Sequence, residues 1–151
     1  MKRFKFRLET VHHLREQRRD AAERQLGKAA AAVVAAAEAV EAIQRQRAQI
    51  EEKFAHTTGL IYADELAQQV EYLDWLGQRE QEARQQLAAR EREREACRHA
   101  AIHAAREAEV TDQLRARQQA RHHAEVARVE QEMLDEMAVS AHWRNVLQEE
   151  S

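Results

Sequence analysis

The sequence has few of the residues that end helices or build sheets. It contains no proline and only three glycines in 151 residues. Val and Ile together number 14 and the aromatic residues number seven, so the side chains that strands favour are scarce. This composition argues against a sheet protein, a doubly wound nucleotide-binding enzyme and a barrel.

Other classes are excluded by further absences. The single cysteine, Cys97, leaves neither a disulfide framework nor a four-cysteine zinc site. No run approaches the roughly 18 apolar residues of a membrane span, and no apolar signal core follows the basic N-terminus. The three glycines are isolated, so they form no phosphate-binding loop. We expect no membrane insertion and no nucleotide hydrolysis by such a loop.

Helix-forming residues are abundant. Ala, Glu, Arg, Leu and Lys make up 87 of the 151 residues, with 30 alanines alone. Such a composition is typical of a long helix or a coiled coil. Disorder usually accompanies a large net charge, whereas the net charge here is −3. We therefore predict an elongated all-α protein.

Apolar residues recur in steps of three and four, which is typical of the narrow seam of a coiled coil. The first series has one polar member, Arg47, and the second also has one, Glu80. The first consists of Leu26, Ala29, Val33, Ala36, Val40, Ile43, Arg47, Ile50 and Phe54, and the second of Leu66, Val70, Leu73, Leu76, Glu80, Ala83 and Leu87.

The break between the two series contains Gly59, which favours a helix stop. We predict helix one over about residues 3–55, a turn at about 56–62, and helix two over about 63–148. A short connection favours antiparallel neighbours. The predicted fold is one long antiparallel two-helix coiled-coil hairpin over residues 1–151, with the second helix longer than the first.

Folding about Gly59 would pair position i with roughly 117 − i. Phe4 would then lie near Gln113, and His12 and His13 would lie near His103. The last thirty-odd residues of helix two would have no partner within the chain, and their exposed apolar side chains would suggest a docking surface.

Charge is segregated along the chain. Residues 1–28 carry nine Lys or Arg against four Asp or Glu, and residues 36–82 carry four against ten. Residues 83–129 carry ten against seven, and residues 130–151 carry one against six. These blocks indicate either solvated helix faces or different partners at the two ends.

The candidate chemistry in the sequence is sparse. His99 and His103 share a helix face with Glu95, which is metal-ligand spacing, but solvated histidines on a polar helix are the better explanation. Cys97 and His99 point apart on a helix, so they form no nucleophile–base pair. We expect no catalytic residue, metal or cofactor. Arginines alternate with glutamates over residues 90–95, so we also expect no nucleic-acid binding.

Tyr72, Trp75 and Leu76 form the most informative cluster. Leu66, Val70 and Leu73 already supply the seam, so the cluster widens the apolar surface sideways. Aromatic residues in such a position are typical interface anchors. The alternative is that they shield a thin coiled coil near its turn.

Three segments together resemble the flagellar export protein FliJ family. The opening residues 3–11, RFKFRLETV, with Leu14, Arg15 and Glu16, resemble its N-terminal signature. Tyr72-Leu73-x-x-Leu76 and Glu132-x-Leu134-Asp135-Glu136-x-Ala138 resemble its middle and late segments. The length and the two-helix layout fit over nearly the whole chain.

The resemblance implies a non-enzymatic, cytoplasmic protein that acts at the cytoplasmic face of the inner membrane with the flagellar export apparatus. It implies a stalk-like subunit that joins a hexameric FliI-like export ATPase, promotes its assembly and activity, and contacts an FlhA-like export gate and export chaperones. By likeness, the ring contacts are Phe4, Phe6, Leu8, Leu134, Asp135 and Glu136. The gate contacts are Tyr72 and Leu76, and we add Trp75 as their neighbour.

Three alternatives remain open at this point. The chain could be the equivalent stalk subunit of a virulence type III secretion system, which would have the same form. It could also be a generic coiled-coil scaffold with no ATPase partner. A helical nucleic-acid-binding arm is the weakest alternative.

Overall fold

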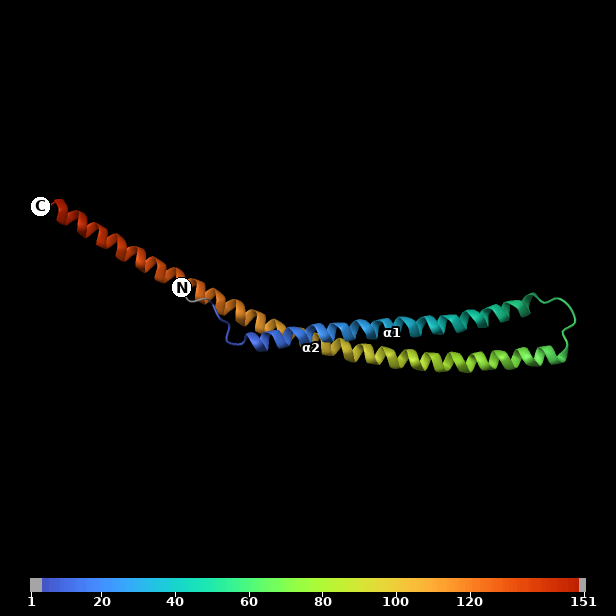
Figure 1. The fold of residues 1–151 in the computed structure, drawn as a ribbon. Helices are drawn as coiled ribbons and strands as arrows, with labels where there is room; N and C mark the ends of the chain where they lie inside the picture. The colour runs from blue at the N-terminus through green and yellow to red at the C-terminus, as the bar shows by residue number, and fades with distance from the viewer. Residues whose placement is uncertain (1–3, 150–151) are drawn as a thin grey trace. The chain divides into compact units, whose positions relative to one another are not determined.

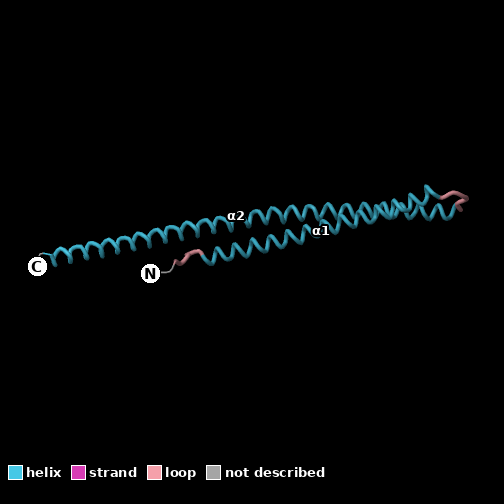
Figure 2. Tube along the Cα trace, turned by 90° about the horizontal axis from the view of Figure 1, so that it is seen from above, coloured by secondary structure: helices cyan, strands magenta, loops and turns pink. Residues whose placement is uncertain are grey.

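The computed structural model describes residues 4–149, which form two helices (Figure 1). Helix α1 spans Glu9–His56 and helix α2 spans Ala63–Glu149. Loops occur only before α1 and between the helices, and residues 4–149 include no strand (Figure 2). The predicted all-α fold of two contacting helices, the second longer than the first, is confirmed.

The chain divides into two compact units, and each contains a piece of both helices. The turn unit is Arg18–Ala104. The terminal unit combines Met1–Gln17 with Ala105–Ser151, of which residues 4–17 and 105–149 are described. Within each unit the α1 and α2 segments run antiparallel, and each unit is described by itself below.

Helix α1 begins at Glu9, whereas the predicted start at Arg3 lies outside the described residues. The backbone N–H of Glu9 donates to the carbonyl of Phe6 at 3.2 Å, and that of His12 donates to Leu8 at 2.8 Å. The chain before Glu9 is therefore a turn rather than a helix. Burial of Phe6 edge-on against the ring of His12 holds it there.

Helix α1 ends at His56 because Thr57 satisfies its last carbonyl groups. The Thr57 hydroxyl donates to the carbonyl of Lys53 at 2.6 Å, and its backbone N–H donates to Phe54 at 3.2 Å. These bonds use acceptors that have no partner within the helix. Gly59 follows in the connection with φ +144°, a backbone conformation that glycine adopts freely. Its role is to redirect the connection, since the helix has already ended.

The three glycines are expected to respond to alanine in opposite directions. Gly59→Ala should cost on the order of 1 kcal/mol because its backbone conformation strains any residue with a Cβ atom. Gly27→Ala and Gly77→Ala should each add about 0.5–1 kcal/mol, because both lie within helices. A Cβ atom at each of the three positions meets nothing within 4 Å, so sterics are matched. Urea unfolding followed by circular dichroism measures all three. A Gly59→Ala variant that is as stable as the Gly27→Ala and Gly77→Ala variants would contradict this account.

The seam of the turn unit follows the predicted spacing. All the α1 seam positions from Leu26 to Phe54 are buried or partly buried except Arg47, the predicted polar exception. Within this unit Ala29 and Val40 are the most buried residues of α1, and Leu76, Ala83 and Ala101 are buried on α2. Since alanine contributes little apolar area, the core of this unit is narrow.

One layer of the seam is polar. Glu80 is only 8% exposed. It accepts a hydrogen bond from the Gln44 amide at 3.0 Å and pairs with Arg84 at 2.6 Å and Arg47 at 3.5 Å. The Gln44 hydrogen bond, helped by the two arginines, holds the pKa of Glu80 below its usual 4.5 even though burial raises it. Glu80 therefore forms a charged layer between apolar layers of the seam, and its carboxylate is paired with Gln44, Arg84 and Arg47.

The register differs from the prediction. In the turn unit Gln44 meets Glu80, and in the terminal unit Glu9 meets Arg115 at 3.3 Å. In each pair the residue numbers add up to 124, instead of roughly 117. The connection extends past the end of α1 before α2 begins (Figure 1). The predicted register assumed instead that the two helices are placed symmetrically about Gly59. Leu66 and Val70 are nearly half exposed for the same reason.

Two predicted neighbours are wrong as a consequence. Phe4 lies against His122, with ring centroids 5.7 Å apart, rather than near Gln113. His12 contacts Thr111 rather than His103. Eight residues of helix separate Thr111 from His103, a distance of about 12 Å along the axis.

Within residues 4–149, neither helix contains a stretch long and apolar enough to cross a bilayer.

Candidate partner-binding surfaces

An exposed aromatic pair lies on α2 near the turn. Tyr72 and Trp75 stack with ring centroids 5.7 Å apart and planes 16° from parallel. The Arg79 guanidinium lies 5.7 Å from the centre of the Trp75 ring, within cation–π range. Tyr72 is 45% exposed and Trp75 is 49% exposed. We call Tyr72 and Trp75 the aromatic patch, a rigid surface that a partner can reach.

Leu76 has a different position from its two neighbours. It is 1% exposed and is the largest fully buried side chain among the described residues. Its spacing within the seam aims it at α1, while Tyr72 and Trp75 lie on the outer side. Leu76 therefore lies in the core of the turn unit, and its assignment as a gate contact stays a prediction.

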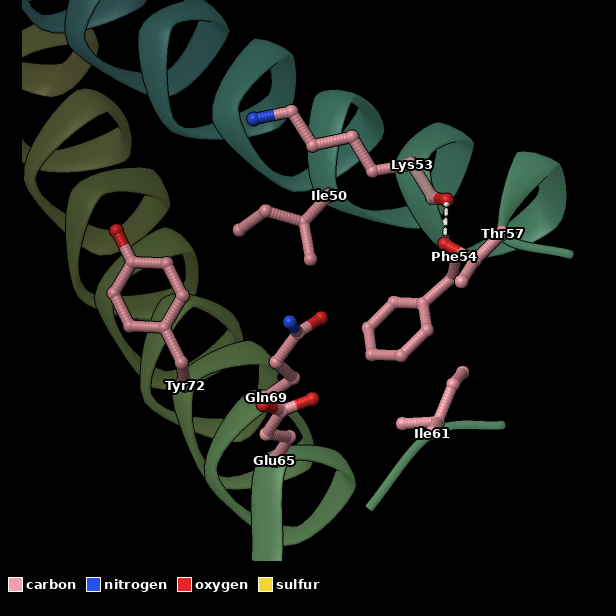
Figure 3. Close-up of a pocket in the computed structure, with 8 residues that line it drawn as sticks. All are labelled: Ile50, Lys53, Phe54, Thr57, Ile61, Glu65, Gln69 and Tyr72. Carbon is pink, nitrogen blue, oxygen red and sulfur yellow. Dashed lines mark hydrogen bonds between the residues drawn. The ribbon is translucent and has the colours of Figure 1, made fainter. Parts of the chain in front are cut away.

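A groove of about 320 Å³ lies between α1, the connection and α2 (Figure 3). Its apolar walls come from both helices and the connection, and polar side chains line its edge. Tyr72 borders this groove and also lines a second hollow with Trp75, Gln68 and Glu71. The residues around the groove are Ile50, Lys53, Phe54, Thr57, Ile61, Glu65, Gln69 and Tyr72. The aromatic patch is therefore continuous with a hollow surface at the turn.

The predicted ring contacts near the N-terminus differ in exposure. Phe4 is partly buried against His122, and Phe6 is buried against His12. Leu8 remains 38% exposed. Phe4 thus attaches the N-terminal segment to α2 and Phe6 packs it against α1, whereas Leu8 remains exposed.

The predicted ring contacts near the C-terminus lie on an open face of α2. Leu134 is 60% exposed, and Asp135 and Glu136 are also exposed. The Gln131 amide donates to Asp135 at 2.9 Å. Leu134 follows His122, the neighbour of Phe4, by twelve residues, or about 18 Å of helix. The structure therefore does not bring the two predicted groups of ring contacts together.

Beyond Val126 most side chains of α2 are exposed, including large apolar ones. These are Val129, Met133, Leu134, Met137, Val139, Trp143 and Leu147. The model of the flagellar FliJ protein family matches residues 4–147. The chain belongs to the FliJ family.

The family match confirms the resemblance indicated by the three sequence segments, all of which fall almost entirely within residues 4–147. Membership of the FliJ family indicates a component of the flagellar protein export apparatus. No curated protein and no solved structure matches it.

The histidines of this FliJ-family protein include exposed ones and one that is buried between the helices. His99 is exposed and its ring lies 3.4 Å from Glu95, so that face is solvated. The buried histidine is His12, and its partners Thr111 and Asp112 come from the other helix. No local spacing signals a contact between residues 99 apart, so sequence reasoning missed it.

Proposed function

We propose that this FliJ-family protein is a non-enzymatic, stalk-like coupling factor of flagellar protein export. It binds a hexameric FliI-like ATPase, promotes the assembly and activity of that ATPase, and contacts an FlhA-like export gate and export chaperones. The observation that carries the proposal is the family match over residues 4–147. The two exposed surfaces, one on each unit, are consistent with at least two partners.

The ATPase-binding surface is assigned to the terminal unit. Leu134 and Met137 present apolar side chains on α2, with Asp135 and Glu136 beside them. Leu8 adds an exposed side chain, and Phe4 and Phe6 hold that segment in place. Exposed apolar groups in such a stretch are typical of a binding surface. An asymmetric helix pair inside a six-fold ring contacts only some subunits at once and so biases which conformations they populate.

The gate-binding surface is assigned to the turn unit. Tyr72 and Trp75 form its exposed aromatic anchors, and Leu76 supports them from the core. Large, rigid aromatic side chains dominate the energetics of many interfaces. The same surface, with the adjoining groove, is available to chaperones. We place the protein at the cytoplasmic face of the inner membrane, where it acts without membrane insertion or nucleic-acid binding.

The test is ATP hydrolysis by the cognate export ATPase with and without this protein. We expect the full-length chain to stimulate hydrolysis severalfold and to co-purify with the ATPase. Leu134→Ala with Met137→Ala should remove most of the stimulation, since both side chains are exposed on α2. Val34→Ala is the matched control because Val34 is similarly exposed but lies in the turn unit.

A folded chain that neither stimulates nor binds the flagellar ATPase would overturn the coupling role and leave a generic scaffold. Stimulation of a virulence-system ATPase alone would transfer the role to that apparatus. Equal losses in the double variant and in Val34→Ala would remove the assignment of the ATPase-binding surface while leaving the coupling role in place.

A further inference from the structure

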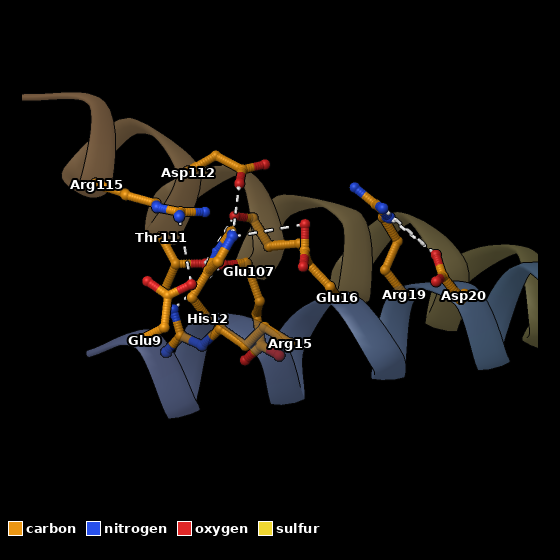
Figure 4. Close-up of polar contacts among 11 residues, drawn as sticks. Glu9, His12, Arg15, Glu16, Arg19, Asp20, Glu107, Thr111, Asp112 and Arg115 are labelled. Carbon is orange, nitrogen blue, oxygen red and sulfur yellow. Dashed lines mark hydrogen bonds and ion pairs between the residues drawn. The ribbon is translucent and has the colours of Figure 1, made fainter. Parts of the chain in front are cut away.

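A buried histidine joins α1 to α2 in the terminal unit (Figure 4). His12 lies one turn into α1 and is 3% exposed. Its ring faces Thr111 and Asp112 of α2, and Glu16 lies one turn farther along α1. Polar groups buried this deeply normally have partners for every donor and acceptor, so each ring nitrogen needs to be accounted for.

The Nδ1 atom of His12 carries a hydrogen. The Thr111 hydroxyl donates its only hydrogen to the carbonyl of Ala108 at 2.8 Å. Its oxygen lies 3.3 Å from His12 Nδ1 and can therefore act there only as an acceptor. Nδ1 must then be the donor, which leaves Nε2 as the atom with a free lone pair in the neutral ring.

The Nε2 atom faces two carboxylates. It lies 3.5 Å from Glu16 Oε1 and 3.4 Å from Asp112 Oδ1. Among residues 4–149, neither carboxylate has an ion pair with any residue other than His12. A lone pair and two negative charges at this separation repel one another unless a cation lies between them.

The nearest arginines do not supply that cation. Arg115 pairs with Glu9 at 3.3 Å, and the Arg15 guanidinium donates to the backbone carbonyl of Glu107 at 3.2 Å. Figure 4 shows both arginines beside the cluster, while the lines from Glu16 and Asp112 converge on the ring of His12. The charge at the centre of the cluster therefore has to come from a proton on Nε2 or from a bound ion.

Two of the three spacings between the ligand atoms match a tetrahedral metal site. Zinc bonds of about 2.0–2.1 Å to nitrogen and oxygen set neighbouring ligands about 3.3 Å apart. The two distances from His12 Nε2 are 3.4 and 3.5 Å, and the three ligand atoms lie within 4.8 Å of one another. One imidazole and two carboxylates form a ligand set that suits zinc, with water as the fourth ligand.

We propose that His12, Glu16 and Asp112 bind one Zn²⁺ ion that cross-links α1 to α2 in the terminal unit. Thr111 completes the site as an outer partner, because it fixes which ring nitrogen faces the ion. The ion would hold the first turns of α1 against α2. The proposal is independent of the proposed coupling role, since it rests only on contacts within the terminal unit.

The test is calorimetric titration of Zn²⁺ into the full-length chain without an affinity tag. We expect one ion per chain and a rise in the thermal unfolding midpoint. Cobalt in place of zinc should give the strong visible absorption of tetrahedral coordination. Asp112→Asn should weaken binding at least about 100-fold, and Thr111→Val about 10- to 100-fold, as for outer partners of metal ligands.

His99→Ala is the matched control, because His99 is an exposed histidine paired with a glutamate on α2. It should leave zinc binding unchanged. Circular dichroism checks that every variant is helical, and Asp112→Asn preserves the shape of the side chain. Absence of zinc binding by the folded chain would overturn the site and leave a proton on Nε2. Binding that His99→Ala removes and Asp112→Asn retains would also overturn it.

Discussion

Leu76→Ala is expected to lower the free energy of unfolding by about 2–5 kcal/mol, the range for a buried leucine truncated to alanine. Leu76 is 1% exposed, and its seam neighbours include alanines that cannot expand into the space. The turn unit should therefore keep most of the resulting cavity. Urea unfolding followed by circular dichroism measures the loss.

Leu66→Ala provides the matched control for this prediction. The chemical change is the same, and Leu66 belongs to the same apolar series of helix two, but it is 46% exposed. Its loss should stay below about 1.5 kcal/mol because truncation there opens a space that water can enter. Equal losses for the two leucines would mean that Leu76 is not the main apolar contact of the seam.

Tyr72→Ala combined with Trp75→Ala should weaken binding to the cytoplasmic part of the export gate at least about 100-fold, if each ring acts as an interface anchor. The thermal unfolding midpoint should change little, since both rings lie outside the seam. Calorimetry or surface plasmon resonance with the purified gate domain measures the affinity.

The control for the aromatic pair is Val110→Ala, an exposed apolar truncation in the terminal unit. It should leave the gate affinity unchanged. An unchanged affinity in the Tyr72→Ala, Trp75→Ala chain would remove the gate assignment from the aromatic patch. Because the variant avoids Leu76, any loss of affinity cannot be attributed to a damaged core.

Much of the fold was predictable because helical periodicity is a local property. The seam of α1 from Leu26 to Phe54 was read from spacing alone, including the exposed Arg47. The family match agrees with three short segments that could be compared residue by residue. Both kinds of signal lie within a few helical turns of the chain.

Longer-range features were not predictable in the same way. The register depended on the path of six connecting residues, for which the sequence offered only Gly59 as a guide. The gate contact at Leu76 rested on the family resemblance and stays a prediction, whereas its burial follows from pairing with α1. His12 meets Thr111 only after both helices have paired, so its cluster depends on the register itself.

The alanine-rich seam has a consequence for how the helices are aligned. Ala29, Ala83, Ala101 and Ala108 are alike in shape, so sliding one helix by a heptad would often exchange one alanine contact for another. Apolar packing alone would leave several alignments close in energy. The layers formed by Glu80 with Gln44 and by His12 with Thr111 have no substitute in a shifted pairing. Buried polar layers can select one alignment in this way, so specificity here depends on the few residues that a coiled-coil core normally excludes.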